Sequence, residues 1–123
     1  MSTDTSLEER IAAVTAAIEA MPGCEANPMA RGVTLYKVMG KMFAILEVNK
    51  SKGVILKVDP ALMDLMKSQY AGVGHRSHLD RRFWLHVDFA GDVPTDEVCR
   101  LVAHSYEQVC AGLTKKQRAA LGV

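Results

Sequence analysis

The residues with the most chemical character in this chain lie close together between His75 and Asp88. The first part of this segment is cationic and carries two histidines, and the second part alternates in character as a strand does. In such a strand Trp84, His86 and Asp88 share one face. A cationic loop beside an outward-facing indole suits the binding of an anionic or planar partner. We therefore expect a binding surface here and not a catalytic centre.

Nucleophilic and metal chemistry find little support in the sequence. The three cysteines are Cys24, Cys99 and Cys110. Their odd number and their spacing do not fit a zinc site, so we expect reduced thiols. His75 and His78 have only Asp80 nearby as a further ligand, which is too few donors for a metal ion. We predict no catalytic residues, no metal site, no cofactor and no enzymatic activity.

Positive charge is concentrated in the middle of the chain, although the net charge is only +1. Residues 1–30 carry five acids and one base, whereas residues 31–70 carry seven bases and three acids. Residues 71–90 add three bases and two acids, and residues 91–123 balance at four each. Such an asymmetry indicates either a solvated surface or a contact surface for a polyanion.

Size and composition are those of one globular domain. The length of 123 residues fits a single domain spanning 1–123, and the apolar fraction of 49% is ordinary. No apolar run approaches the ~20 residues that cross a bilayer. The polar, acidic segment from Met1 to Arg10 precedes no signal-peptide core. We expect a cytoplasmic protein without a membrane partner.

Helix signals are clear in four places. Ser6 and Glu9 form a capping box ahead of apolar residues at helical spacing, and Pro22-Gly23 ends that helix. The other predicted helices begin at Asp59-Pro60, at Thr95 as a cap, and at Lys115. The helix from Thr95 is expected to be the longest.

Strand signals fall between these helices. The predicted strands are 34–39, 42–49, 54–58 and 83–89, with loops at 24–32 and 73–82. The first three are joined by short lysine-bearing glycine turns, which is typical of an antiparallel meander. The order α-βββ-α-β-α predicts an α+β fold, a two-layer sandwich with an antiparallel sheet and helices on one face.

Strand alternation also predicts what each face of the sheet carries. The helix-packed face receives Ala44, Leu46, Val48, Val54, Leu56, Val58, Leu85 and Val87. The open face receives Leu35, Lys37, Phe43, Ile45, Glu47, Ile55, Lys57, Trp84 and His86. That set is too apolar for a face that meets only water, so we expect a terminal segment, a second copy of the chain, a ligand or a nucleic acid to cover it.

Aromatic residues interleaved with cations can stack on bases and neutralise phosphates, which points to DNA as a partner. The candidate nucleic-acid-binding residues are Lys37, Lys41, Lys50, Lys52, Lys57, Arg76, His78, Arg81, Arg82 and Trp84. Phosphate contacts position a protein without reading sequence, so weak and salt-sensitive binding is expected. Taken singly, each lysine is more typical of a solvated loop tip.

The chain resembles the MmcQ/YjbR family of small bacterial proteins over nearly its whole length. The segments that carry the resemblance are Met21-Pro22-Gly23, Tyr36-Lys37-Val38, Gly40-Lys41-Met42-Phe43-Ala44, Leu56-Lys57-Val58-Asp59-Pro60, His78-Leu79-Asp80-Arg81-Arg82-Phe83-Trp84, His104-Ser105-Tyr106 and Lys115-Lys116. Together and in this order they are specific.

The resemblance implies a fold like that of the frataxin relative CyaY, and DNA binding through a "double-wing" arrangement of hairpins. The sequence departs from the family pattern at Asp80, where Asn is usual, and at Phe83, where His is usual. Both changes remove polar or cationic character beside Trp84.

Two further hypotheses remain open. The first is a small-molecule site, or an unrecognised enzyme, built from His78, Trp84, Lys37 and Tyr106. The second is an interaction protein that forms a homodimer through the open face of its sheet. Stabilisation by anionic metabolites would distinguish the first, and the sedimentation of the protein at high concentration would distinguish the second.

Overall fold

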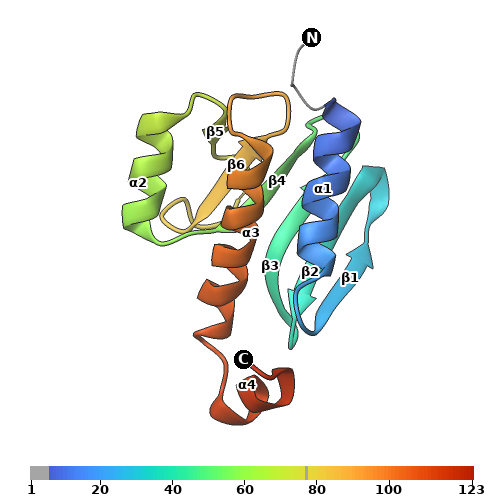
Figure 1. Ribbon diagram of the computed structural model, residues 1–123, viewed down its shortest axis with the longest axis vertical. Helices are drawn as coiled ribbons and strands as arrows, with labels where there is room; N and C mark the ends of the chain where they lie inside the picture. Colours follow the sequence, from blue (N-terminus) through green and yellow to red (C-terminus); the bar gives the residue numbers. More distant parts are fainter. Residues whose placement is uncertain (1–5, 77) are drawn as a thin grey trace.

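A computed structural model of the chain describes residues 6–76 and 78–123 (Figure 1). Residues 1–5 and Ser77 lie outside the described residues, so part of the N-terminal segment considered above lies there too. The helices and strands are α1 (Leu7–Glu19), β1 (Cys24–Pro28), η1 (Ala30–Gly32), β2 (Val33–Val38), β3 (Lys41–Glu47), β4 (Gly53–Lys57), α2 (Pro60–Gln69), β5 (Val73–Gly74), β6 (Trp84–Asp88), α3 (Thr95–Cys110) and α4 (Lys115–Leu121).

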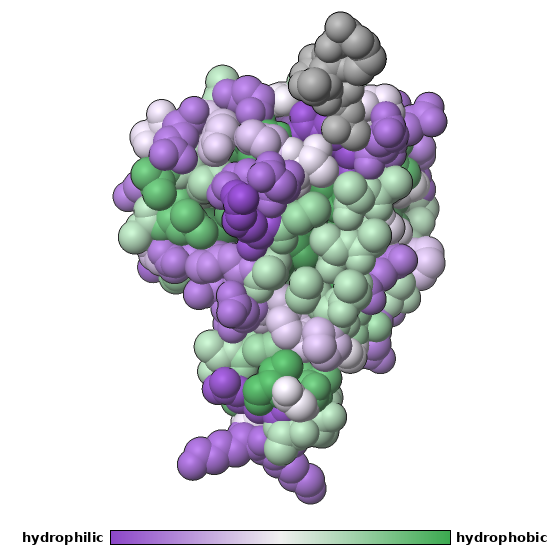
Figure 2. All heavy atoms as spheres, viewed as in Figure 1, coloured by the Kyte–Doolittle hydropathy of each residue, from purple (hydrophilic) through white to green (hydrophobic). Residues whose placement is uncertain are grey.

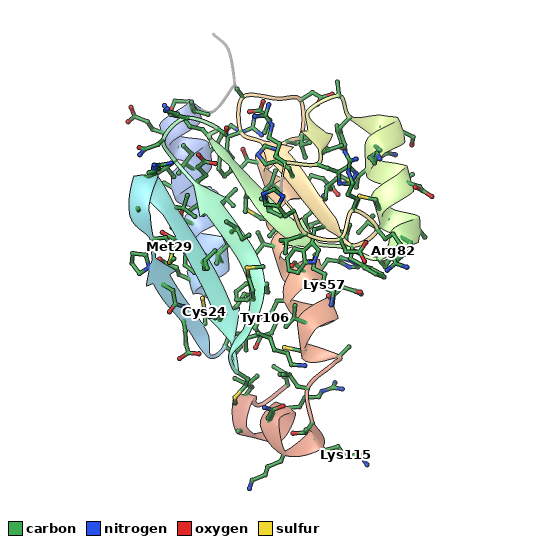
Figure 3. The ribbon with its side chains drawn as sticks, turned by 180° about the vertical axis from the view of Figure 1, so that it is seen from behind. Cys24, Met29, Lys57, Arg82, Tyr106 and Lys115 are labelled. Carbon is green, nitrogen blue, oxygen red and sulfur yellow. The ribbon has the colours of Figure 1, made fainter. Side chains whose placement is uncertain are left out.

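One antiparallel sheet organises the described residues, with its strands in the order β1-β2-β3-β4-β6-β5. Helices α1 and α3 pack against each other and cover one face, and α3 crosses β3 and β4 (Figure 1). From behind, the strands lie in front of these helices and their other face is uncovered (Figure 3). The predicted α+β fold with helices on one face is confirmed, while a likeness to CyaY stays a prediction.

The helix-covered side carries the hydrophobic core. Leu56, Leu85 and Val87 are fully buried beneath the helices, as are Val98 and Val102 from α3. Seen from outside, mildly apolar residues gather over α1, and hydrophilic ones extend from the end that carries α4 (Figure 2). Fully burying a large aliphatic side chain contributes about 1.5–3 kcal/mol, so this side provides most of the stability.

The helix starts follow the local sequence closely. The Ser6 hydroxyl accepts from the Glu9 amide at 3.1 Å, and the Glu9 carboxylate accepts from the Ser6 amide at 3.2 Å, so the predicted capping box is confirmed. Asp59 caps α2 by accepting from the Leu62 amide at 2.8 Å. The prediction for Thr95 was wrong by one residue, because Pro94 is the N-cap of α3 and no side chain caps it.

Two strands were predicted as loops. β1 pairs along its length with β2, from Cys24 opposite Val38 to Pro28 opposite Thr34. Pro28 is tolerated there because β1 is an edge strand of the sheet. β5 is the other edge, and its two residues pair with Val87 and His86. Short edge strands take their pairing from the neighbouring strand, not from an alternating pattern of their own.

A break in register between β2 and β3 decides the side on which Phe43 lies. Tyr36 pairs with Ala44, but the next residue, Lys37, pairs with Met42, so Phe43 is skipped. Such a bulge turns an extra side chain toward the neighbouring face. Phe43 is fully buried, with its ring edge-on to Tyr106 at 5.5 Å between centroids. The prediction that Phe43 lies on the open face was therefore wrong.

The buried hydroxyl of Ser105 bridges β3 and β4 beyond this bulge. It donates to the Phe43 carbonyl at 2.6 Å and accepts from the Lys57 amide at 2.8 Å. The paired residues of the two strands end at Ala44 and Leu56, so the hydroxyl takes the place of the next ladder bonds. Ser105 is thus a structural residue, because it allows β3 and β4 to separate at Phe43 and Lys57 without leaving their backbone groups unpaired.

One further residue departs from the predicted helix-packed face. Val48 lies beyond the end of β3 and is exposed, with 37% of its surface accessible. The turn before β3 consists of Met39 and Gly40, both with positive φ, which is the geometry of a tight hairpin. The predicted strands 34–39 and 42–49 end one and two residues too late, because the turns override alternation.

Candidate nucleic-acid interface

The centre of the open face is an apolar row that runs across three strands. Leu35, Ile45 and Ile55 are neighbours in register, and each is only partly buried. His86 of β6 continues the row next to Ile55. Within the described part of the chain no helix lies over these side chains. The row separates two ends of the face, which differ in chemistry.

The Trp84 end, defined by Lys37, Lys57, Arg81, Arg82 and Trp84, carries the indole. Lys57 and Trp84 are directly opposite on β4 and β6. The Val58 amide donates to the Phe83 carbonyl at 2.7 Å, which makes the next pair, Lys57 with Trp84, a close pair without hydrogen bonds between its backbones. The Lys57 stem therefore lies beside the indole, and both side chains are half-buried. Lys57 lies on the uncovered face (Figure 3).

The loop before β6 places two arginines at the rim of this end. Arg82 forms an ion pair with Asp80, with Nη2 to Oδ2 at 2.7 Å and Nε to Oδ1 at 3.1 Å. This hydrogen bonding lowers the pKa of Asp80 to about 2. The Arg82 guanidinium also lies over the Phe83 ring, 5.2 Å from its centroid. Arg82 is thus partly neutralised, whereas Arg81 forms no ion pair among the residues that the structure describes.

A groove between α2 and this loop adds His75, which was considered above as a metal ligand and not among the nucleic-acid-binding residues. Its volume is about 470 Å³, and Lys67, His75 and Arg81 line it. His75 Nδ1 lies 3.1 Å from the Trp84 carbonyl, and its Nε2 lies 3.2 Å from Lys67 Nζ. Because a carbonyl only accepts and an ammonium only donates, Nδ1 carries the proton and Nε2 accepts. His75 holds the backbone of Trp84 in place.

The His86 end, defined by Lys50, Ser51, Lys52, Arg76 and His86, extends from the middle of β6 to the β3–β4 turn, at the opposite end of β4 from Lys57. Arg76 Nη1 donates to the Ser51 hydroxyl at 3.4 Å, which ties the loop after β5 to the β3–β4 turn. His86 is nearly buried, and burial together with Arg76 lowers the pKa of its imidazole. His86 is two positions along β6 from Trp84, which corresponds to about 7 Å.

The structure therefore divides the predicted binding residues into two groups and leaves two apart. Lys41 Nζ lies 3.3 Å from the Gly112 carbonyl, so it points toward the C-terminal end of α3 and away from the open face. His78 is exposed in the loop before β6. Sequence reasoning missed His75, Lys67 and the pocket at His86. Only for His86 was there a signal, because it alternates with Trp84.

The four residues of the small-molecule hypothesis do not come together. Tyr106 is buried on the helix side, where its hydroxyl donates to the Pro22 carbonyl at 2.7 Å. Burial raises the pKa of Tyr106 to about 12, and hydrogen bonding with Cys110 adds to this. Trp84 and Lys37 lie on the other face, so Tyr106 cannot share a site with them.

The described residues offer little support for a metal site, a reactive thiol or a membrane-spanning helix. No three histidine, cysteine or acidic side chains of residues 6–76 and 78–123 group closely enough to hold a metal ion. Burial raises the pKa of the Cys24 and Cys99 thiols, which makes both poorer nucleophiles at neutral pH. In the same part of the chain, no helix combines the length and apolar character needed to cross a bilayer.

Comparison with known proteins gives a consistent match. A family model described as YjbR matches residues 19–108. The Escherichia coli K12 protein described as "Uncharacterized protein YjbR" is 33% identical over 89 residues, which cover 72% of this chain and 75% of that protein. The same description and values apply to a relative from Escherichia coli O157:H7.

Two solved structures share the architecture. A Deinococcus radiodurans protein with a DUF419 domain has a TM-score of 0.77 at 25% identity, covering 89% of this chain and 86% of that one. A Pseudomonas syringae protein has a TM-score of 0.57 at 19% identity, covering 69% and 86% respectively, and this likeness concerns the fold alone.

Proposed function

The chain belongs to the YjbR family, and from that premise we propose that it binds DNA weakly through the Trp84 end of the open sheet face. The proposed role is binding without catalysis and without a cofactor, in the cytoplasm. The observation that carries it is the position of Trp84, a partly exposed indole on an uncovered face, opposite Lys57 and next to the loop of Arg81.

The chemistry of this end fits a nucleic-acid strand. An indole offers a stacking surface to an unpaired base, worth about 1–3 kcal/mol per base. Lys37, Lys57 and Arg81 are cations on or beside the same face, and each phosphate that they neutralise releases counterions. A twisted sheet with one aromatic platform suits an unpaired strand better than a duplex, so single-stranded DNA is the preferred partner.

The same geometry explains why the binding is expected to be weak. Asp80 already pairs with Arg82. Glu25 of β1 is the register neighbour of Lys37, which offsets part of its charge. Few cations at this end remain for phosphates, and phosphate contacts position a strand without reading its bases. The binding should therefore be sequence-tolerant and strongly dependent on salt.

The test is the fluorescence anisotropy of a labelled single-stranded oligonucleotide and of its duplex, measured over a salt series. Trp84→Ala should weaken single-strand binding by about 5- to 150-fold, from the loss of one stacked base. Lys57→Gln should lower the slope of log affinity against log salt by about 0.7, from the loss of one phosphate contact. Circular dichroism verifies that both variants are folded.

Lys116→Gln provides the matched control, because Lys116 is an exposed lysine of α4, away from the open face. It should leave the binding unchanged. An absence of binding at low salt, or an affinity that does not respond to salt, contradicts the proposal. If Lys116→Gln and Lys57→Gln weakened DNA binding equally, the net charge of the protein would determine the affinity and the position of the lysine on the open face would not.

The apolar row supports a second candidate, a homodimer through the same face. Leu35, Ile45 and Ile55 are partly accessible together, and contiguous apolar surface of this kind is typical of interfaces. Sedimentation at high protein concentration should then detect a dimer that Ile45→Lys abolishes. Sedimentation as a monomer throughout would eliminate this candidate and leave the DNA proposal untouched.

A further inference from the structure

A second depression, of about 290 Å³, opens at the His86 end. The β3–β4 turn, the start of α1 and the loops around β5 and after β6 come together there, at the top of the molecule in Figure 1. Leu7 and Ala90 form its apolar wall, and the remaining lining residues are polar or charged. The Trp84 end lies at the other end of β4 and β6, so the two regions can be tested separately.

His86 lines this pocket, and its imidazole has no hydrogen-bond partner among the described residues. Only 7% of His86 is exposed, and among residues 6–76 and 78–123 its ring nitrogens form no hydrogen bond. The ring occupies space that exists because residue 53 is glycine, since a Cβ there would lie 2.5 Å from His86 Nε2. Arg10 Nε is the one fully buried side-chain nitrogen or oxygen of the described residues that has no partner, so the unpaired ring nitrogens of His86 keep some accessible surface through which a ligand can reach them.

Cations surround this imidazole and outnumber the acids of the pocket. Lys50, Lys52 and Arg76 line it, against the single carboxylate of Asp88. One oxygen of that carboxylate already accepts from the Ala90 amide at 2.9 Å. Within the described residues none of the three cations forms an ion pair. The unbalanced charge favours an anionic ligand and disfavours a metal cation.

A hydrogen bond to Ser51 fixes the position of the Arg76 guanidinium beside His86. The guanidinium is tied to the Ser51 hydroxyl at 3.4 Å, which leaves most of its N–H groups free beside His86. Arg76 also lowers the pKa of His86, together with burial, while Asp88 and Glu47 act in the opposite direction. The imidazole is therefore neutral at neutral pH and has one N–H to donate.

We propose that this pocket binds a phosphate group, held by the Arg76 guanidinium, the His86 imidazole N–H and the ammonium groups of Lys50 and Lys52. The donors come from a turn, a loop and a strand and so approach from different directions. A tetrahedral phosphate accepts from several directions at once, whereas a carboxylate offers two oxygens in one plane. The proposal does not depend on DNA binding at Trp84.

The direct test is an NMR titration of the isotope-labelled protein with inorganic phosphate. Saturable shifts should be confined to residues 50–53, 74–76 and 86–90, and they should include the His86 ring. Arg76→Gln should weaken phosphate binding by about tenfold, because it removes charge-assisted hydrogen bonds. Arg76 is exposed, so this variant is expected to fold. Lys116→Gln and Trp84→Ala should both leave the titration unchanged.

The source of the phosphate is distinguished in a second set of titrations. Adenosine 5′-monophosphate is compared with adenosine, and an oligonucleotide with a 5′-phosphate is compared with one that has a 5′-hydroxyl. Tighter binding of the phosphorylated ligand in the first pair alone assigns the pocket to small phosphomonoesters. Tighter binding of the phosphorylated ligand in the second pair assigns it to the end of a nucleic-acid strand.

Three results would overturn the proposal. The first is the absence of a phosphate preference in both pairs. The second is a set of shifts that do not saturate or that extend equally to the lysines of α4. The third is a phosphate affinity that Arg76→Gln leaves as it was.

Discussion

The two faces of the same sheet present opposite environments to alternate residues of the same strands. On β4 and β6, Leu56 and Leu85 face the helices and are fully buried. Their immediate neighbours, Lys57 and Trp84, face outward and are half-buried. Stability and binding are therefore separable in this fold, because one residue step moves a side chain from the core to an uncovered surface.

Helices α1 and α3 account for this asymmetry. They cover one face and leave the other without a packing layer, so selection for a packed core acts on only half of the strand residues. Substitutions on the helix side should therefore reduce the free energy of unfolding. Substitutions on the open face should change binding and leave stability nearly as it was.

The largest effect is expected from Phe43→Ala, because the bulge places this ring in the core. The loss of a buried phenyl ring should reduce the free energy of unfolding by about 3–5 kcal/mol in urea denaturation. Ile45→Ala, two residues along on the open face, is the control and should cost clearly less. If the two variants were equally destabilised, the distinction between the faces would not hold.

A smaller loss is expected from Ser105→Ala. Removing the hydroxyl leaves the Phe43 carbonyl and the Lys57 amide without partners between two strands, at a cost of about 1–3 kcal/mol. Hydrogen exchange should show faster exchange of the Lys57 amide in the variant. Ser68→Ala is the control, since Ser68 is exposed and bonds only within α2. Unchanged stability of Ser105→Ala would mean that water replaces the bridge.

The smallest effect on stability is a dependence on pH that originates at His86. Its folded-state pKa is lowered by burial and by Arg76, so the unfolded chain binds a proton more readily. The stabilisation is fully present above the unfolded value of about 6.5 and is lost as the pH falls below it toward the folded pKa. Unfolding in urea at a series of pH values from about 7.5 to about 5.5 should reveal this loss.

Arg76→Gln tests whether the guanidinium contributes to this pH dependence of stability. Without the guanidinium the folded-state pKa of His86 should rise toward its unfolded value, and the loss of stability on acidification should become smaller. NMR titration of the His86 ring assigns the effect to that residue. A His86 pKa equal to that of an unfolded histidine, or above it, would contradict the electrostatic description of this end.

The parts of the fold that follow from sequence are those that depend on neighbours along the chain. The Ser6 capping box and the Asp59 cap of α2 rest on residues three apart, and both are as predicted. β1 has no alternating pattern and contains Pro28, and it becomes a strand only because β2 is beside it. The Phe43 carbonyl at the bulge likewise accepts from a hydroxyl that lies 62 positions away in the chain.

For the candidate sites, the sequence predicts the positions of residues on strands and not of residues on loops. Alternation places Lys57 and Trp84 on the open face. It cannot place loops, so the sequence did not separate Arg76, which bonds to Ser51, from Arg81 near Trp84. Nor could it show that Lys41 points toward Gly112. Long side chains on turns take their direction from whatever packs nearby, which is a tertiary property.

Trp84 is the only tryptophan of the chain, so its fluorescence reports on the proposed interface without a label. The most direct measurement is a titration of the protein with a single-stranded oligonucleotide at low salt, followed through this emission. The proposal predicts saturable quenching that added salt reverses and that duplex DNA produces only weakly. Emission that stays constant while anisotropy reports bound oligonucleotide would place the binding elsewhere and contradict the assignment to the open face.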